Sequence, residues 1–191
     1  DAPESKQQIA CTRSFGQPVT ELEPLIEAVS EFASRAGEKL RKQNSVAREL
    51  LVFIHTSPHR QGPQLSRSVV VPLRRPTDDS RLLAGAAADA MRSMYLPGYR
   101  FIKAGVILVD LQPARVQQQE LDLEPEQEPE TARDRSRLMV AMDVINQRYG
   151  KGTLHVGSTG QTAPQRAWGM KQERRTPQYT TRLEDVPVAR A

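Results

Sequence analysis

Apolar residues repeat with two different spacings over residues 5–111 of the chain. Alternating or short continuous apolar runs predict strands at about 5–15, 48–56, 66–73 and 99–110. Apolar positions three and four residues apart predict helices at about 21–43 and 79–95. The predicted order over this region is therefore β-α-β-β-α-β.

The two helices carry the strongest local signals. The first has one apolar stripe, made of Leu22, Leu25, Ile26, Val29, Phe32, Ala33, Ala36 and Leu40. Thr20 and Glu23 stand three residues apart, the spacing of a capping box at the start of this helix. The Asp78–Asp79 pair caps the second helix, and Pro97-Gly98 ends it.

The strands predict an α+β fold with a four-stranded sheet. The run at 48–56 is almost continuously apolar, which is typical of a central strand. We expect Gly16-Gln17-Pro18 to end the first strand. Because two helices can cover only one face of such a sheet, the other face must be solvated or bound to a partner.

The chain changes character after residue 111. Residues 112–131 are rich in Gln, Glu and Pro and predict a flexible acidic linker. A helical spacing returns at about 132–148, and the remaining residues are glycine-rich and then basic. We therefore expect a domain at 1–111, a linker at 112–131 and a second module at 132–191, built from a helix with irregular chain or a hairpin.

The composition limits the classes of protein that fit. The net charge of +4 and the sequence pI near 9.5 weakly favour an anionic partner. Cys11 is the single cysteine, so no internal disulfide can form, and we interpret it as a buried structural thiol. Without a signal peptide or a spanning apolar run, we expect a cytoplasmic protein. The chain starts at Asp1-Ala2-Pro3 without a Met, which we interpret as a fragment of a longer protein.

The residues that could carry chemistry do not form a catalytic pattern. The three histidines, His55, His59 and His155, have no metal-ligand spacing with Cys11. The Gly157–Gly160 segment lacks the lysine of a phosphate-binding loop. The Asp78–Asp79 pair is explained as a helix cap rather than a metal-binding pair. We expect no catalytic site, metal or cofactor in this chain.

Basic residues fall on the predicted strands or at their ends. They are Lys6, Arg13, Arg67, Arg74, Arg75, Arg100 and Lys103. They could mark a sheet face that follows a phosphate backbone, or they could be ordinary solubilising charges. Their spacing does not separate these two interpretations.

Several segments resemble the UmuC family of Y-family translesion DNA polymerases. Ile9–Gly16 (IACTRSFG) and Pro18–Glu23 resemble the opening of its little-finger domain. Further matches are Ala33–Arg41 (ASRAGEKLR), Phe53–Pro58 (FIHTSP), Tyr99–Val106, Arg137–Asn146, Gly152–Leu154, Trp168–Lys171 (WGMK) and Thr176–Arg182 (TPQYTTR). The resemblance covers nearly the whole chain.

This resemblance implies a DNA-holding role without catalysis. In the family the sheet of the little finger contacts the DNA backbone, while the catalytic palm, with its Mg²⁺ ions, and the fingers precede this region. The candidate contacts, on the predicted strands and their ends, are Lys6, Arg13, Ser14, Arg67, Ser68, Arg74, Arg75, Arg100 and Lys103. The family also implies roles in the SOS response and in mutagenesis.

The resemblance also implies protein partners. A clamp-binding peptide of the form Gln-Leu-x-Leu-Phe follows the little finger in the family, and the matching stretch here is Glu120, Leu121, Asp122, Leu123 and then Glu124. Glutamate replaces both the Gln and the aromatic anchor, so binding to the sliding clamp stays open. Processed UmuD and RecA are the other implied partners.

Two alternatives to DNA binding remain. The chain could be a protein-interaction module that docks processed UmuD, RecA or the sliding clamp and binds little DNA itself. An independent enzyme is the third hypothesis, which the missing catalytic pattern disfavours.

Overall fold

The computed structural model describes residues 5–114, 135–160, 166–171, 177–178, 180–182 and 184. Its elements are β1 (Ile9–Val19), α1 (Leu22–Lys42), β2 (Ser45–Thr56), β3 (Ser66–Thr77), α2 (Ser80–Met94), β4 (Phe101–Pro113), α3 (Arg135–Tyr149) and the 3-10 turn η2 (Gly157–Thr159). The predicted α+β class and the β-α-β-β-α-β order are confirmed.

The four strands form one antiparallel sheet in the order β1-β4-β2-β3. The apolar strands β2 and β4 lie at its centre, as expected for the run at 48–56. Prolines occur within both edge strands, at Pro18 in β1 and at Pro72 and Pro76 in β3. An edge strand tolerates proline because one of its sides needs no ladder hydrogen bond.

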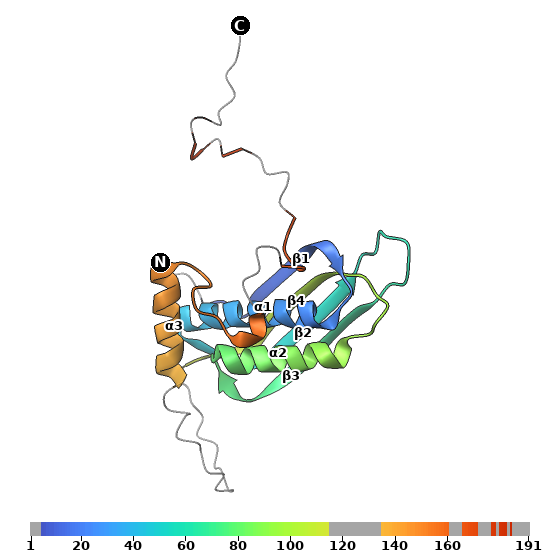
Figure 1. Ribbon diagram of the computed structural model, residues 1–191. Coiled ribbons are helices and arrows are strands. Elements are labelled where there is room, and N and C mark those ends of the chain that lie inside the picture. Colours follow the sequence, from blue (N-terminus) through green and yellow to red (C-terminus); the bar gives the residue numbers. More distant parts are fainter. Residues whose placement is uncertain are drawn as a thin grey trace.

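Both α1 and α2 cover the same face of the sheet (Figure 1). Leu25, Val29, Phe32 and other members of the predicted stripe of α1 are buried there. The two helices approach closely at Gly37, where an added Cβ would lie 2.9 Å from the Ser80 hydroxyl oxygen. The opposite face of the sheet has no helix over it, as the sequence predicts.

Three element boundaries differ from the predictions. β1 continues through Gly16-Gln17-Pro18 to Val19, with a register shift between Ser14 and Val19 in its pairing with β4. β3 similarly runs on to Thr77, because its prolines lie on an edge strand. The capping box is wrong: Glu21 is the N-cap residue of α1, and it forms no side-chain cap hydrogen bond. The Asp79 carboxylate does cap α2, accepting a bond from the Arg81 amide at 2.8 Å.

The helix predicted at 132–148 is α3, and it packs on the helical layer of the sheet. It lies across the region where α1 ends and α2 begins (Figure 1). Met139 is fully buried, and the Asp143 carboxylate accepts two bonds from the Arg41 guanidinium of α1, at 2.6 and 2.8 Å. α3 is therefore attached to the sheet domain by both an apolar contact and an ion pair.

Trp168 extends this attachment. Its side chain is only 1% exposed and joins the core of the sheet domain. The indole meets the Phe32 ring edge to face, with centroids 5.7 Å apart. The Gly16 amide in β1 donates a 2.8 Å hydrogen bond to the Gly169 carbonyl. Residues 166–171 thus lie against the edge strand and complete the core beside it.

The expected linker and the Glu120–Leu123 clamp-like motif lie outside the described residues, so neither is tested here. The expected division at 1–111, 112–131 and 132–191 also remains a prediction. Among the described residues after 134, the structure has a helix and a 3-10 turn but no strand.

Candidate nucleic-acid interface

The uncovered face of the sheet is defined by the pairing of the strands, since residues directly opposite one another share a face. Three cross-strand rows point away from the helices. They are Ser14–Lys103–His55–Ser66, then Thr12–Gly105–Phe53–Ser68, then Ala10–Ile107–Leu51–Val70. We call these twelve positions the open face.

Phe53 lies across the middle of the open face. A Cβ added at Gly105, the residue opposite it on β4, would come within 2.5 Å of the Phe53 ring and of the Thr12 methyl group. The ring therefore covers Gly105 and makes this part of the surface flat. The Phe53 and His55 rings lie 4.9 Å apart between centroids, with an interplanar angle of 36°.

Positive charge concentrates at one end of the open face. Lys103 lies opposite His55, whose Nδ1 is hydrogen-bonded to the Ser66 hydroxyl at 2.7 Å. Burial first, and then repulsion by Lys103, lowers the pKa of His55 below its usual value. The loop that follows β2 and the turn that precedes β4 add Arg60 and Arg100 at this same end.

The predicted contacts divide between the two faces. Ser14, Ser68 and Lys103 lie on the open face. Arg13 and Arg67 lie on the helix side, in one row with the buried Ala104 and Ile54. The Arg67 guanidinium donates a 3.2 Å bond to the Met94 carbonyl at the end of α2. These two arginines are therefore not part of the uncovered face on which we expected them.

The other predicted basic residues lie away from the centre. The Arg100 side chain is exposed at the Lys103 end of the sheet. Arg74 and Arg75 are exposed on the last part of β3, beyond the end of its regular register with β2. Lys6 precedes β1, and its backbone exchanges two hydrogen bonds with the Gln43 side chain at the end of α1.

Sequence reasoning missed Thr12, Phe53, His55 and Ser66 on the open face. The signal for the faces was present in the alternation of the strands. Arg13 shares parity with the apolar Ile9, Cys11 and Phe15, and Arg67 shares parity with Val69 and Val71. Counting by twos from these apolar residues assigns both arginines to the covered face and Lys103 to the open one.

The described residues show little sign of catalytic chemistry. No group of three or more His, Cys, Asp or Glu residues among them could hold a metal ion. None of the helices in the described ranges is long and apolar enough to cross a membrane. What the geometry offers is a flat, uncovered, partly aromatic surface with a basic end.

Comparison with known proteins assigns the family. The model of the impB/mucB/samB family C-terminal domain matches residues 6–121. The chain belongs to this family. A second model, a domain of unknown function (DUF4113), matches residues 136–189, which include α3 and Trp168.

Family members align with the whole length of the chain. It is 39% identical over 193 residues to protein ImpB of Salmonella typhimurium, covering 100% of this chain and 43% of that protein. It is 38% identical to protein UmuC of the same species, over 95% of this chain and 42% of that protein. Protein MucB of Escherichia coli is 35% identical, over 98% and 42%. The predicted UmuC-like relationship is confirmed, and the chain spans less than half the length of these relatives.

One solved structure with a similar backbone is an insertion ternary complex of Dbh DNA polymerase. The TM-score is 0.44 at 10% identity, covering 53% of this chain and 28% of that one. A likeness of this size adds nothing to the family assignment.

Proposed function

We propose that this chain is the DNA-holding, C-terminal part of an error-prone Y-family translesion polymerase of the SOS response. The observation that supports the proposal most is the open face, an uncovered four-stranded surface with Lys103 and His55 at one end. An impB/mucB/samB family C-terminal domain over residues 6–121 is consistent with it. The catalytic palm and its Mg²⁺ ions belong to the rest of the parent protein under this proposal.

The chemistry of the open face favours contacts with the DNA backbone over recognition of bases. Lys103 supplies a charge for one phosphate, and the hydroxyls of Ser14, Ser66 and Ser68 supply short hydrogen-bond donors beside it. The three rows carry no Asn, Gln or Arg, the side chains best suited to bidentate base contacts. We therefore expect sequence-tolerant binding.

Fluorescence anisotropy of the full 191-residue chain with a labelled primer-template duplex tests this function. Binding should appear at low salt and weaken as salt rises. The variant Lys103→Ala should bind several-fold more weakly, and its slope of log affinity against log salt should fall by about 0.9. The matched control is Arg92→Ala, since Arg92 lies exposed on α2, away from the sheet face. Absence of duplex binding at low salt would contradict the proposal.

A second candidate function, protein docking, is favoured by α3. Leu138, Val140, Val144 and Tyr149 are exposed on this helix, with Val140 and Val144 57% and 56% accessible. Exposed apolar side chains one turn apart suit a protein partner. Processed UmuD is the partner we propose for them, with RecA and the sliding clamp as further candidates.

A binding assay of the full chain against processed UmuD tests the docking function. The double variant Val140→Asp/Val144→Asp should lose binding, whereas Gln147→Asp, an exposed polar position on the same helix, should retain it. DNA binding should be unchanged in both. Equal binding by all three proteins would contradict a role of α3.

A further inference from the structure

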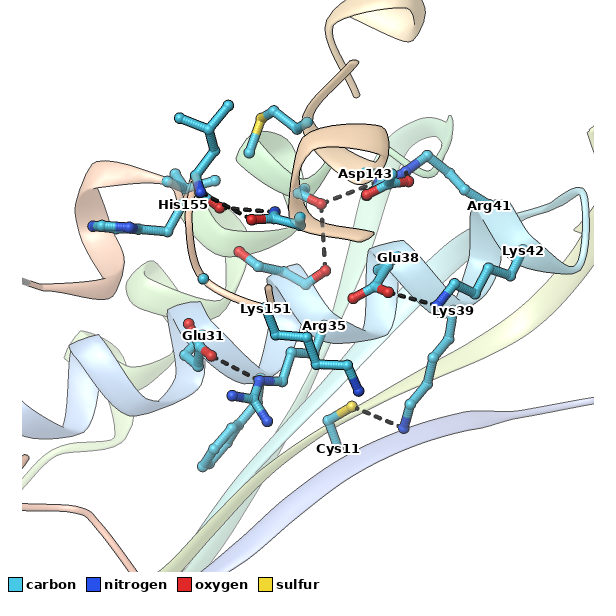
Figure 2. A pocket seen from close by; sticks show the side chains of 18 of the residues that line it. Cys11, Glu31, Arg35, Glu38, Lys39, Arg41, Lys42, Asp143, Lys151 and His155 are labelled. Atoms are coloured by element: carbon cyan, nitrogen blue, oxygen red, sulfur yellow. Dashed lines mark hydrogen bonds and ion pairs between the residues drawn. The ribbon is translucent and has the colours of Figure 1, made fainter. Parts of the chain in front are cut away.

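A second basic surface lies on the helix side of the edge strand β1. It is a crevice of about 430 Å³ between β1, α1 and the chain that runs from α3 to η2. Six cationic side chains line it, namely Arg13, Arg35, Lys39, Arg41, Lys42 and Lys151. Figure 2 shows several of them around Cys11. The crevice is distinct from the open face, and it includes residues of the C-terminal region.

The carboxylates of the crevice are already paired. They form three ion pairs, Glu31–Arg35, Glu38–Lys42 and Asp143–Arg41, with N–O distances of 2.6 to 2.7 Å. Arg13, Lys39 and Lys151 have no carboxylate partner in the described part of the chain. The Lys39 ammonium donates only to the Ala10 carbonyl, at 3.2 Å, and to the Cys11 sulfur, at 3.3 Å. Three cations from three different elements therefore converge without a counter-charge.

The environment of Arg13 shows the effect of this convergence. Burial, and next the repulsion of Arg35, lowers the pKa of the Arg13 guanidinium, although Glu31 acts in the opposite direction. Arg166 adds further repulsion. An anion bound in the crevice would relieve this repulsion, which gives the site a reason to prefer negatively charged ligands.

We propose that this crevice binds the phosphate backbone of a single DNA strand. Arg35, Lys39 and Lys42 are four and three residues apart on α1, so they form a row about 10 Å long. Such a row exceeds the reach of one phosphate group and suits a linear polyanion. Lys151 and Arg13 flank the row from the α3–η2 chain and from β1.

The position of β1 favours DNA over an acidic peptide. Successive residues of this edge strand point to opposite sides, so Thr12 and Ser14 lie on the open face while Cys11 and Arg13 line the crevice. A strand that leaves a duplex held on the open face would have to pass only the edge of β1 to enter the crevice. This choice of ligand rests on the proposed function.

Cys11 provides a direct test, because it is the single cysteine of the chain and lines the crevice. The rate at which iodoacetamide alkylates Cys11 in the full chain would be measured with and without a 15-nucleotide oligothymidylate. The oligonucleotide should slow alkylation several-fold. Absence of protection at saturating oligonucleotide would overturn the proposal.

Variants assign the protection to the crevice. In Lys151→Ala/Arg13→Gln, protection should be lost, and the salt slope for oligothymidylate should fall by about 1.4. Lys151→Ala alone should fall by half of that, and it serves as the safer variant because this exposed side chain has no partner to lose. Arg92→Ala is the charge-matched control and should retain full protection. Equal protection in all variants would overturn the assignment.

Two competitors and one sheet variant separate the remaining sources. If inorganic phosphate or poly-glutamate at equal charge protected Cys11 as well as the oligonucleotide, the site would not be a DNA-strand site. Lys103→Ala should weaken duplex binding but preserve protection by oligothymidylate. Protection without any duplex binding would support the crevice while contradicting the proposed function of the open face.

Discussion

His55 lies on the open face with a lowered pKa, so its ring is neutral near pH 7. A bound phosphate backbone favours the protonated ring, and proton uptake below about pH 6.5 would add a second charge beside Lys103. We therefore expect duplex affinity at constant ionic strength to rise by up to about fivefold between pH 7.5 and pH 5.5. Anisotropy titrations at several pH values would measure this change.

The variant His55→Gln should flatten that pH profile, and His155→Gln, at an exposed position outside the open face, should leave it unchanged. The free protein should respond in the opposite direction. Because the folded pKa of His55 is lowered, its contribution to stability is complete above about pH 6.5 and is lost as the pH falls through the folded value. A profile that persists in His55→Gln would show that another group is responsible.

Gly16 carries a constraint of packing rather than of backbone angle. An added Cβ would lie 2.6 Å from the Lys171 amide nitrogen and 2.7 Å from the Lys171 Cβ. Gly16→Ala should therefore push residues 166–171 away from β1 and destabilise the fold by about 1–3 kcal/mol. Urea unfolding followed by circular dichroism would measure the loss. Gly85→Ala, at an open position on α2, should be neutral or slightly stabilising.

At the scale of elements, one ion pair fixes α3 on α1. The Arg41 guanidinium is 11% exposed and also donates to the Asp78 carbonyl and the Ser80 hydroxyl. Asp143→Ala should destabilise the protein by about 1–2 kcal/mol, since the pair is only partly shielded from water. A double-mutant cycle with Arg41→Ala would isolate the coupling between the two side chains. A coupling near zero would show that Met139 alone holds α3.

The sequence predicted the secondary structure of residues 5–111 well and the faces of its strands poorly. Leu50, Val52 and Ile54 are apolar on the covered side of β2, but Leu51 and Phe53 are apolar on the open side. A central strand of this kind has little alternation, so it cannot indicate which side meets the helices. The edge strand β1 does alternate, and its parity correctly places Arg13 on the covered side. Contacts that depend on tertiary position, such as Phe53 on Gly105, needed the three-dimensional arrangement.

At the scale of the whole molecule, Trp168 joins the two sequence regions that the family models separate. Trp168→Ala should cost about 3–5 kcal/mol, because it empties a fully buried site beside Phe32. Trp168→Phe should cost less than half as much, since the indole Nε1 has no hydrogen-bond partner among the described residues. Urea unfolding of both variants followed by circular dichroism would measure the difference.

Trp168 is also the single tryptophan of the chain, so its fluorescence reports on the attachment of the C-terminal segment. If this segment belongs to the same cooperative unit as the sheet, the fluorescence and circular dichroism transitions in urea should coincide. A fluorescence transition at clearly lower urea would show that residues 166–171 detach before the sheet unfolds. Nothing in the sequence placed this residue in the core, because its partner Phe32 is 136 positions away.

The buried Trp168 sets an order of events during synthesis. The last strand of the sheet ends at Pro113, but the side chain that fills the space beside Phe32 is made roughly 50 residues later. At ordinary rates of translation this delay lasts about 3–10 s, which is long compared with the folding of a small domain. During that time the nascent sheet domain exposes an apolar hole next to an unpaired edge strand. We therefore expect ribosome-bound chains that stop before residue 168 to recruit chaperones more strongly than chains that extend past it.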